Sequence, residues 1–468
     1  MKIEKLNNTF LKAPVAIHFL LGIIVFSIRF YFNFSQELIP GVNGGYYPLQ
    51  VRSILVNGHL GFSDMPLLFY FDAFLIKFIS LFGFSITDSL ILSVVKIVDS
   101  ISIPLLLLPL YKIIRLSNSL QILKTSIIAF SVLSFSPLIL TSDLQKNALA
   151  VVFVFGFLAY YLSFQINKKR IEFFLSFVFL ILTGLTHFGT FIFELFFLLL
   201  IVFHTYKKKA IIPMIILVAV GLGIVFLIDS SRFNRVVAFW TVIFEKPALL
   251  NGMLSPPDFL IILFSIVLAI IGIIILKSKS SSLKPFQKNI LFASIVCLLA
   301  CSFPLIDGEY LKRLGLFLFI PQLLLILQIS TAISIKKQKM ISIFLFIFTF
   351  LSILAVAGHP KETVIDKNAN EDLKKLSSII KNDKETIIIA RHGLEWWIAW
   401  ALHTKVGQDK AIDKTFFKKY KIVIFINQVN GFSTDKERTP FHEPYVPKNS
   451  VIIFSSEYFK AYKLNNNQ

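Results

Sequence analysis

The sequence from residue 14 to residue 358 is a series of long apolar runs separated by short charged segments. A helix needs about 20 apolar residues to cross a bilayer core of about 30 Å, because each residue rises about 1.5 Å. Hydrophobic residues make up 56% of the 468 in the chain, and 51 are phenylalanine, more than a water-soluble core requires. We therefore expect a polytopic α-helical membrane protein. Its eleven apolar runs lie at 14–34, 90–111, 122–140, 148–166, 171–186, 188–204, 210–228, 257–276, 289–306, 314–332 and 340–358.

Lysine and arginine residues cluster in the short segments on one side of these runs. Such clusters mark the cytoplasmic side of a membrane protein. With eleven spans, the N-terminus is expected in the cytoplasm of a plasma (inner) membrane protein. The segments expected outside are residues 35–89, 141–147, 229–256, 307–313 and those after 358. The net charge of +20 then reflects orientation in the membrane, and no nucleic-acid partner is expected.

The composition changes after Gly358, where charged segments begin to alternate with three short apolar strings. The strings TIIIA, KIVIFIN and SVIIFSS are separated by helix-like stretches at 370–381, 394–402 and 412–420. Apolar strands that alternate with helices predict a small α/β domain with a parallel sheet. We expect residues 1–358 to form the transmembrane domain and residues 359–468 an extracytoplasmic α/β domain.

Three tryptophans, Trp396, Trp397 and Trp400, lie on the expected helix that follows the string TIIIA. Residues just after a strand end often bind ligands in open α/β sheets. The alternative is that these side chains pack the domain on the membrane face. The sequence leaves both interpretations open.

The first outside loop, residues 43–66, is polar although apolar runs flank it. Its apolar positions Tyr47, Val51, Ile54 and Leu55 recur at helical spacing, and Gly58 is a typical helix stop. This pattern predicts an amphipathic helix at 46–57 in the outer membrane interface. A second juxtamembrane helix is expected at 66–82, because its Asp72 argues against an ordinary span.

Several motifs occur in a defined order: an amide turn followed by "YY…R", a helix opening with MPLLFY, a basic cytoplasmic turn and SPLILTSDLQKNALAVVF. This order resembles the membrane module of the class C (GT-C) glycosyltransferases, in particular the branch of protein O-mannosyltransferases and lipid A aminoarabinose transferases. The likeness covers roughly residues 14–205. It implies transfer of a sugar from a polyprenyl phosphate carrier to an acceptor outside the membrane, with an acidic residue of the first outside loop as base.

The resemblance also implies the partners of the chain. These are a polyprenyl-phosphate-linked sugar, membrane lipid, and an envelope glycan, lipid or protein as acceptor. No cofactor is expected.

The chain departs from this family at Asn43, in the string GVNGGYY, where the relatives carry an acidic residue. An amide cannot accept a proton, so either another carboxylate serves or the chain does not catalyse the reaction. Asp64 closes the same loop and is the candidate base. Alternatively, Asp64 caps the helix that follows it.

Asp143, in the second outside turn TSDLQKN, matches the position of a second functional aspartate in the relatives. Its expected task is to orient the acceptor or the catalytic loop. Alternatively, Ser142 and Asp143 begin a helix in which Lys146 is the partner of Asp143.

A polyprenyl phosphate needs cations at the interface, because its charge cannot enter the hydrocarbon. The outside basic residues expected near it are Arg52, Lys146, Lys312 and Arg313. Arginine suits phosphate because its planar fork binds two oxygens. The alternative is that these charges simply extend to the interface from span ends. The predicted substrate-binding set also includes Asn43 and Tyr46 of the first loop.

Two pairs of polar residues lie at or inside apolar runs. His187 and Glu194 are seven apart and are expected to share a face of the sixth span. A buried ionised carboxylate there costs about 3 kcal/mol, which makes Glu194 a functional candidate, although a neutral glutamate that joins helices is the alternative. The resemblance allows His187 to donate to the carrier phosphate. Lys96 and Asp99 are expected to pair with each other as a structural feature.

The chain has two cysteines, Cys297 and Cys301, four apart in one apolar run. They are expected to be small packing residues on one helix face. The sequence has no cysteine and histidine cluster with metal spacing and no glycine-rich phosphate loop, so neither a metal nor a nucleotide sugar is expected. A lipid-linked saccharide flippase or transporter, and a non-catalytic scaffold with this architecture, are the alternative functions.

Overall fold

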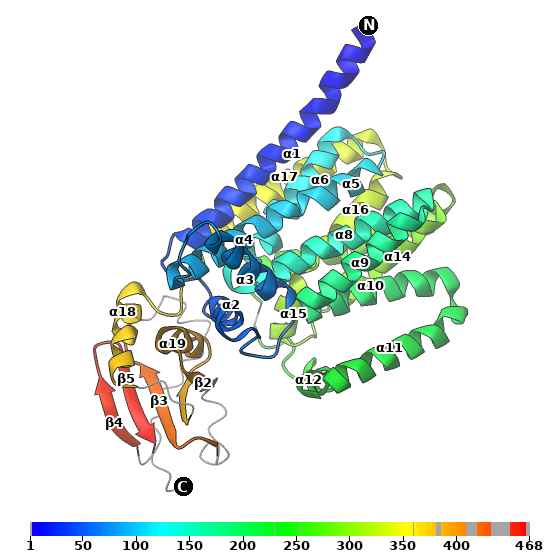
Figure 1. Cartoon of the computed structure of the whole chain (residues 1–468). Helices are drawn as coiled ribbons and strands as arrows, with labels where there is room; N and C mark the ends of the chain where they lie inside the picture. The colour runs from blue at the N-terminus through cyan, green and yellow to red at the C-terminus, as the bar shows by residue number, and fades with distance from the viewer. Residues whose placement is uncertain are drawn as a thin grey trace. The chain divides into compact units, whose positions relative to one another are not determined.

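The computed structural model describes residues 2–228, 230–252, 254–358, 360–380, 385–408, 419–431 and 450–464. These residues are mostly helical, with a small sheet near the C-terminus (Figure 1). The helices before residue 358 are α1 (Lys2–Phe34), α2 (Tyr46–Asn57), α3 (Leu67–Ser80), α4 (Asp88–Leu105), α5 (Leu107–Arg115), α6 (Gln121–Leu133), α7 (Phe135–Ile139), η1 (Ser142–Leu144), α8 (Gln145–Asn167), α9 (Arg170–Thr186), α10 (Phe188–Tyr206), α11 (Lys208–Ile228), α12 (Ser230–Val242), α13 (Pro256–Ser278), η2 (Ser280–Ser282), α14 (Pro285–Cys301), α15 (Gly308–Gly315), α16 (Phe319–Ser330) and α17 (Ile335–Ala357).

Among the described residues, seven helical segments are long and apolar enough to cross a membrane. The bent pair α15 and α16, with an angle of 49° between them, makes an eighth if it is counted as one span. One of the seven, Asp88–Arg115, combines α4 and α5, and Pro104 explains the interruption because proline cannot complete the helical hydrogen-bond ladder. These segments indicate a multi-pass membrane protein, while the count of eleven spans stays a prediction.

The chain forms two compact units. The helical unit consists of Met1–Val25, Ile103–Leu140 and Ala150–Val356. The sheet unit consists of Phe26–Ser102, Thr141–Leu149 and Ala357–Gln468. The sheet unit therefore contains the polar loop at residues 43–66 and the turn at residues 141–147 as well as the C-terminal segment. It is larger than the predicted domain at 359–468, and the division of the chain at residue 358 stays a prediction.

The interior of the helical unit is built on α14, which packs against α10, α13 and α16. Cys297 and Cys301 are both free and buried on α14. The two thiols thus lie four residues apart on the buried side of one helix, as small packing residues. The prediction from their spacing is confirmed.

The sheet has the strand order β2-β1-β3-β5-β4. Its strands are β1 (Thr386–Ala390), β2 (Lys405–Gln408), β3 (Ile422–Gln428), β4 (Ser450–Ser455) and β5 (Phe459–Leu464). The three predicted strings form β1, β3 and β4, whereas β2 and β5 were not expected. The prediction of a parallel sheet is correct for two of the four strand pairings and wrong for the other two. β1 pairs in parallel with β2 and β3, whereas β5 is antiparallel to β3 and β4. The reason is that β5 follows β4 after a three-residue turn, and so short a connection only joins antiparallel strands.

Two helices, α18 (Lys367–Lys375) and α19 (Leu394–Leu402), pack against this sheet (Figure 1). The prediction at 394–402 is confirmed by α19, and the one at 370–381 overlaps α18 and the short η3 (Leu376–Ser378). The helix predicted at 412–420 falls almost wholly outside the described residues. The strands contribute a hydrophobic cluster of buried side chains that includes Ile389, Val423 and Tyr462.

Candidate functional site

The polar loop at residues 43–66 folds back on its own helix. α2 ends at Gly58, which has a φ of 79° and donates its N–H to the carbonyl of Ile54, so the predicted stop is confirmed. The polar side of α2 is covered, because the buried Gln50 donates to the carbonyl of Phe62 (2.9 Å) and accepts from its N–H (3.0 Å). The loop is polar because it hydrogen-bonds the polar face of α2.

The second predicted helix is α3, which buries Leu68, Phe69, Asp72, Ala73 and Ile76 along one face. Asp72 is fully buried on that face. Burial, together with the nearby Asp99, raises the pKa of Asp72 well above its usual value. A neutral Asp72 needs no cation beside it.

Asp64 lies at the centre of a polar cluster formed by the loop and α8. Its Oδ2 accepts from the hydroxyl of Tyr46 (2.5 Å) and forms an ion pair with the Nζ of Lys146. Its Oδ1 accepts from the N–H of Met65 (2.7 Å). Each side chain of the ion pair is only 13% exposed. The Lys146 ammonium also lies over the rings of Tyr46 and Phe69, 5.4 and 5.5 Å from their centroids, within the range of a cation–π interaction.

The structure does not show Asp64 capping the following helix. α3 has Pro66 at its N-cap and no side-chain hydrogen bond there, because the Asp64 carboxylate is directed to Tyr46, Lys146 and its neighbour Met65 instead. Burial opposes ionisation of Asp64, but the Lys146 ammonium and the hydrogen bonds from Lys146, Tyr46 and Met65 outweigh it. The pKa of Asp64 therefore lies below its usual 3.8, and the group is ionised at neutral pH.

Asp143 pairs with Lys361, and Lys146, its partner in the alternative interpretation, pairs with Asp64. The Oδ1 of Asp143 accepts from Lys361 Nζ at 2.6 Å. Ser142 has a φ of 61°. Asp143 lies in the short 3-10 helix η1, just before α8, so the spacing rule for a regular α-helix does not apply between it and Lys146. Lys146 is one residue inside α8 and reaches Asp64.

The adjacent residues Tyr46 and Tyr47 connect the two aspartates. Tyr46 donates to Asp64, and the hydroxyl of Tyr47 donates to the backbone carbonyl of Asp143 (3.2 Å). Burial raises the pKa of Tyr47 well above its usual value, so the hydroxyl stays a donor. Asp64 and Asp143 thus belong to one compact unit and flank the same tyrosine pair.

A buried polar network holds the turn at residues 141–147. Asp99 of α4 accepts from Arg29 Nη2 (2.8 Å) and from Asn33 (2.6 Å), both on α1. The same carboxylate accepts from the hydroxyl of Thr141 and the N–H of Ser142, each at 2.9 Å. Every residue of this network is buried. The network holds the backbone of Ser142 at its positive φ. It thereby fixes the position of the next residue, Asp143.

The expected pair of Lys96 and Asp99 does not form. Lys96 donates to the backbone carbonyls of Gln36 (2.7 Å) and Glu37 (2.8 Å) just after α1. Arg29 takes the place beside Asp99, because its fork reaches both the carboxylate and the Asp99 carbonyl. Both residues remain structural, as the sequence indicated, but with other partners.

Arg52 binds the end of α19. Its Nη1 donates to the carbonyl of Trp400 (2.7 Å) and its Nη2 to the carbonyl of Ala399 (2.9 Å). The guanidinium lies over the Trp400 ring, 4.1 Å from the centroid, and also faces Asp88 at 3.7 Å. The last carbonyls of a helix lack intrahelical donors, and Arg52 satisfies two of them. Its fork therefore faces protein rather than the expected carrier phosphate.

The tryptophans of α19 pack against the polar loop at residues 43–66. Trp397 and Trp400 are buried, and the ring of Trp396 lies 5.0 Å from that of Tyr46 and 5.1 Å from that of Phe62. Gly45, at the start of α2, approaches the same helix so closely that a Cβ would meet the Trp397 ring at 2.9 Å. The aromatic side chains thus join α19 to the loop that carries Asp64.

His187 and Glu194 belong to the helical unit. His187 precedes α10 with extended backbone, and its Nδ1 accepts from the N–H of Thr190 (3.1 Å), so it caps the helix instead of sharing a regular face with Glu194. Glu194 is buried within α10.

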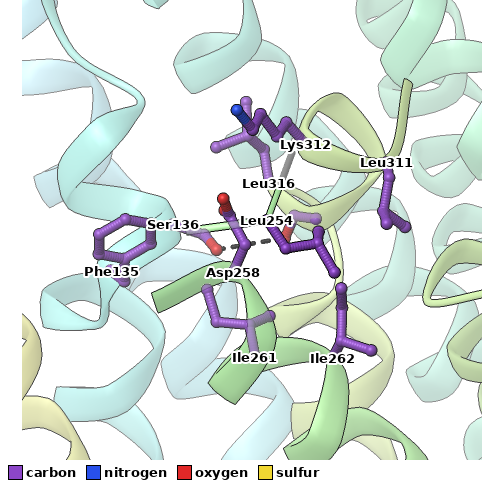
Figure 2. Close-up of a pocket in the computed structure, with 10 residues that line it drawn as sticks. Phe135, Ser136, Leu254, Asp258, Ile261, Ile262, Leu311, Lys312 and Leu316 are labelled. Carbon is purple, nitrogen blue, oxygen red and sulfur yellow. Dashed lines mark hydrogen bonds between the residues drawn. The ribbon is translucent and has the colours of Figure 1, made fainter. Parts of the chain in front are cut away.

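Lys312 and Arg313 lie on α15 of the helical unit. Arg313 forms an exposed ion pair with Glu309 at 3.6 Å. Lys312 lines a pocket of about 20 Å³ whose walls come from α7, α13 and α15 (Figure 2). This is room for about one water molecule, so the pocket is too small for a lipid phosphate. Neither residue belongs to the compact unit that contains Asp64 and Asp143.

The remaining loop residue of the predicted set, Asn43, accepts from the N–H of Tyr46 through its backbone carbonyl (3.1 Å) in the turn before α2. Sequence reasoning missed Lys361 and Tyr47 as members of the site. The adjacent tyrosines of the string YYPL were a signal for Tyr47, whereas Lys361 is one of many lysines after the last apolar run. Within the part of the chain that the structure describes, no three His, Cys, Asp or Glu side chains gather as metal ligands would.

No protein-family model matches the chain, and no curated protein matches it. Solved structures do. The archaeal oligosaccharyltransferase AglB from Archaeoglobus fulgidus, in complex with an inhibitory peptide and a dolichol-phosphate, aligns with a TM-score of 0.57 and 11% identity over 87% of this chain and 69% of its own. ArnT from Cupriavidus metallidurans aligns over 98% of both chains in its apo state, with a TM-score of 0.52 and 8% identity. Bound to undecaprenyl phosphate, ArnT aligns with a TM-score of 0.50 and 9% identity over 97% of this chain and 98% of its own. Both proteins are class C glycosyltransferases, so the chain has the fold of that class.

Proposed function

We propose that this chain, which has the class C glycosyltransferase fold, transfers a sugar from a polyprenyl phosphate carrier to an acceptor hydroxyl outside the plasma membrane. The fold supports a lipid-linked reaction, since the structural neighbours ArnT and AglB were solved with undecaprenyl phosphate and dolichol-phosphate. The observation that carries the proposal is the cluster of Asp64, Tyr46 and Lys146, which places a carboxylate, a hydroxyl and an ammonium together.

In the proposed reaction, the ionised carboxylate of Asp64 accepts the proton of the acceptor hydroxyl. The hydroxyl oxygen attacks the anomeric carbon, the bond from that carbon to the carrier phosphate breaks, and the phosphate leaves with the electron pair. Lys146 stabilises the negative charge of the leaving phosphate. Such a direct displacement inverts the anomeric configuration. Tyr46 holds Asp64 through its hydroxyl, and Asp143 orients the acceptor or the loop.

The ion pair with Lys146 gives the proposed base two states. Without carrier, the ammonium neutralises Asp64 and contributes to its low pKa. A low pKa keeps the carboxylate ionised but makes it a weak base. A carrier phosphate that competes for Lys146 would draw the ammonium away and increase the basicity of Asp64. Carrier binding before acceptor binding is the order that this arrangement favours.

The proposed topology follows the sequence: eleven spans, a cytoplasmic N-terminus, α2 and α3 as juxtamembrane helices, and a C-terminal domain outside. In this arrangement Asp64, Asp143, Lys146 and Arg52 face the extracytoplasmic side. The sugar donor would then be a carrier that already presents its sugar outside.

The flippase or transporter alternative has less support. Transporters of that kind show paired broken helices in corresponding halves. The described residues contain a single bent pair, α15 and α16. Two observations support the scaffold alternative: Asn43 stands where the relatives have an acid, and Asp64 is neutralised by Lys146.

A transfer assay separates these functions. Purified protein in lipid nanodiscs is incubated with polyprenyl phosphates that carry radiolabelled sugars and with a panel of glycan, lipid and peptide acceptors. The proposal predicts a labelled acceptor and free polyprenyl phosphate. A scaffold releases no polyprenyl phosphate from any donor, and a flippase moves labelled donor across liposomes without breaking it down.

A further inference from the structure

The segment that follows α17 is held against the residues that follow α1. The side chain of Gln36 donates to the carbonyl of Lys361 (3.0 Å) and accepts from the N–H of Thr363 (2.9 Å). Between these contacts, the N–H of Gly41 donates to the carbonyl of Glu362 (2.8 Å). Three hydrogen bonds over three residues fix the backbone of this segment and therefore the starting point of the Lys361 side chain.

From this fixed point, the side chain of Lys361 reaches the second outside turn. Its Nζ donates to the Oδ1 of Asp143 (2.6 Å) and to the carbonyl of Thr141 (3.0 Å). The two side chains of the ion pair are 19% and 14% exposed. A partly buried pair is screened less by water than one at the surface, so its geometry is better defined.

The other neighbours of Asp143 restrict it further. Gly41, at a φ of 88°, lies directly against the Asp143 carboxyl, and a Cβ at this position would overlap it. Tyr47 holds the backbone carbonyl of Asp143 from the first outside loop. Asp143 is thus approached from two segments of the sheet unit, by Gly41 and Tyr47 from Phe26–Ser102 and by Lys361 from Ala357–Gln468.

We infer that Lys361 is a positioning residue that aims the Asp143 carboxylate in the transfer reaction. The inference rests on the proposed function and adds to it a residue of the segment that leads to the C-terminal sheet. Lys361 acts through Asp143: without the ammonium, the carboxylate loses the donor that selects one of its rotamers. The segment after the last apolar helix therefore belongs to the site and is more than a connection between two domains.

The test compares Lys361→Met and Lys361→Arg with Lys367→Met, an exposed lysine six residues further on that serves as control. Lys361→Met is expected to lower kcat by about tenfold to a hundredfold, the usual effect of a misplaced group. The KM for the carrier is expected to stay within about twofold, since the variant removes no carrier contact. Lys361→Arg is expected to recover most of the activity, and Lys367→Met to behave as wild type.

Two results would overturn the positioning role. A higher KM for the carrier with kcat unchanged would show that Lys361 binds the phosphate itself. A fully active Lys361→Met would show that Asp143 needs no such partner. To exclude a general loss of structure, melting is measured for Lys361→Met, Asp143→Asn and the double variant. Non-additive shifts in Tm support the pair, and strictly additive shifts contradict it.

The two proposals fail in different ways. Wild-type protein that transfers no sugar contradicts the proposed function. Active wild-type protein together with a fully active Lys361→Met contradicts the positioning role alone.

Discussion

Asp64 and Lys146 form an ion pair although 82 positions separate them in the sequence. Asp64 comes from the end of the polar loop at residues 43–66, and Lys146 comes from the first turn of α8. Tyr46 donates to the same oxygen of Asp64 that faces Lys146. The pair therefore sets both the charge and the orientation of the carboxylate that we propose as the base.

Replacing Lys146 tests whether its ammonium binds the carrier. Lys146→Met is expected to raise the Kd for a polyprenyl phosphate by about tenfold or more, because a hydrogen bond to a charged group contributes about 1.5–3 kcal/mol. Lys146→Arg keeps the charge and should bind within a few-fold of wild type. Equilibrium binding of a radiolabelled carrier to nanodiscs measures both. Lys77→Met, at an exposed position of α3, is the control, and equal affinities in all four proteins would contradict a phosphate-binding role.

The lowered pKa of Asp64 predicts how stability depends on pH. A carboxyl whose pKa is lower in the folded state stabilises the fold above its usual pKa, and this contribution is lost as the pH falls through the folded value. The usual value is 3.8 and the folded pKa lies below it, so the contribution is complete at neutral pH and disappears in acid. Melting curves between about pH 6 and pH 2 should show a steeper fall in Tm for wild type than for Asp64→Asn. Parallel curves would show that the pair does not shift this pKa.

The network around Asp99 predicts a large effect on stability. Arg29→Met leaves the buried Asp99 carboxylate without its cation, and such a loss costs about 3–5 kcal/mol. The double variant Arg29→Met with Asp99→Asn removes both charges and should be more stable than Arg29→Met alone. Thermal unfolding in detergent micelles measures all three proteins. A single variant as stable as wild type would contradict the proposed importance of this network.

Arg52 is predicted to hold α19 and to leave carrier binding unaffected. Lysine cannot reproduce a fork that reaches the carbonyls of Ala399 and Trp400 together. In Arg52→Lys, amide exchange in the last turn of α19 should therefore be at least about tenfold faster than in wild type, since each lost charged hydrogen bond contributes about 1.5–3 kcal/mol. Hydrogen–deuterium exchange of residues 394–402 tests this. Unchanged exchange combined with a loss of carrier affinity would instead support the phosphate-binding role expected from the sequence.

The local patterns of the sequence predicted local structure well. The helical spacing before Gly58 located α2, and the strings TIIIA, KIVIFIN and SVIIFSS located β1, β3 and β4. Each of these signals depends on residues within a few positions of one another. Strand β5 was not predicted because Lys460 and Lys463 interrupt the apolar residues of FKAYKL, although Phe459 and Tyr462 are buried.

The ion pairs of the site could not be read in the same way. Helical spacing suggested an ion pair between Asp143 and Lys146 and another between Asp99 and Lys96, because residues three apart are neighbours on a regular helix. In the structure, Asp143 lies in the 3-10 helix η1 and pairs with Lys361, and Asp99 pairs with Arg29, so both partners come from distant parts of the sequence. A carboxylate takes the partner that the tertiary fold brings closest, and a single sequence does not reveal which lysine or arginine that is.

The rate of sugar transfer by Asp64→Asn tests the central claim most directly. The measurement follows labelled sugar from a polyprenyl phosphate donor to the acceptor in nanodiscs, with Glu457→Gln, an exposed carboxylate of the sheet unit, as control. If Asp64 is the base, Asp64→Asn should lower kcat by about a hundredfold to ten-thousandfold while the protein still binds carrier and melts cooperatively. Transfer by Asp64→Asn at the wild-type rate would contradict the account.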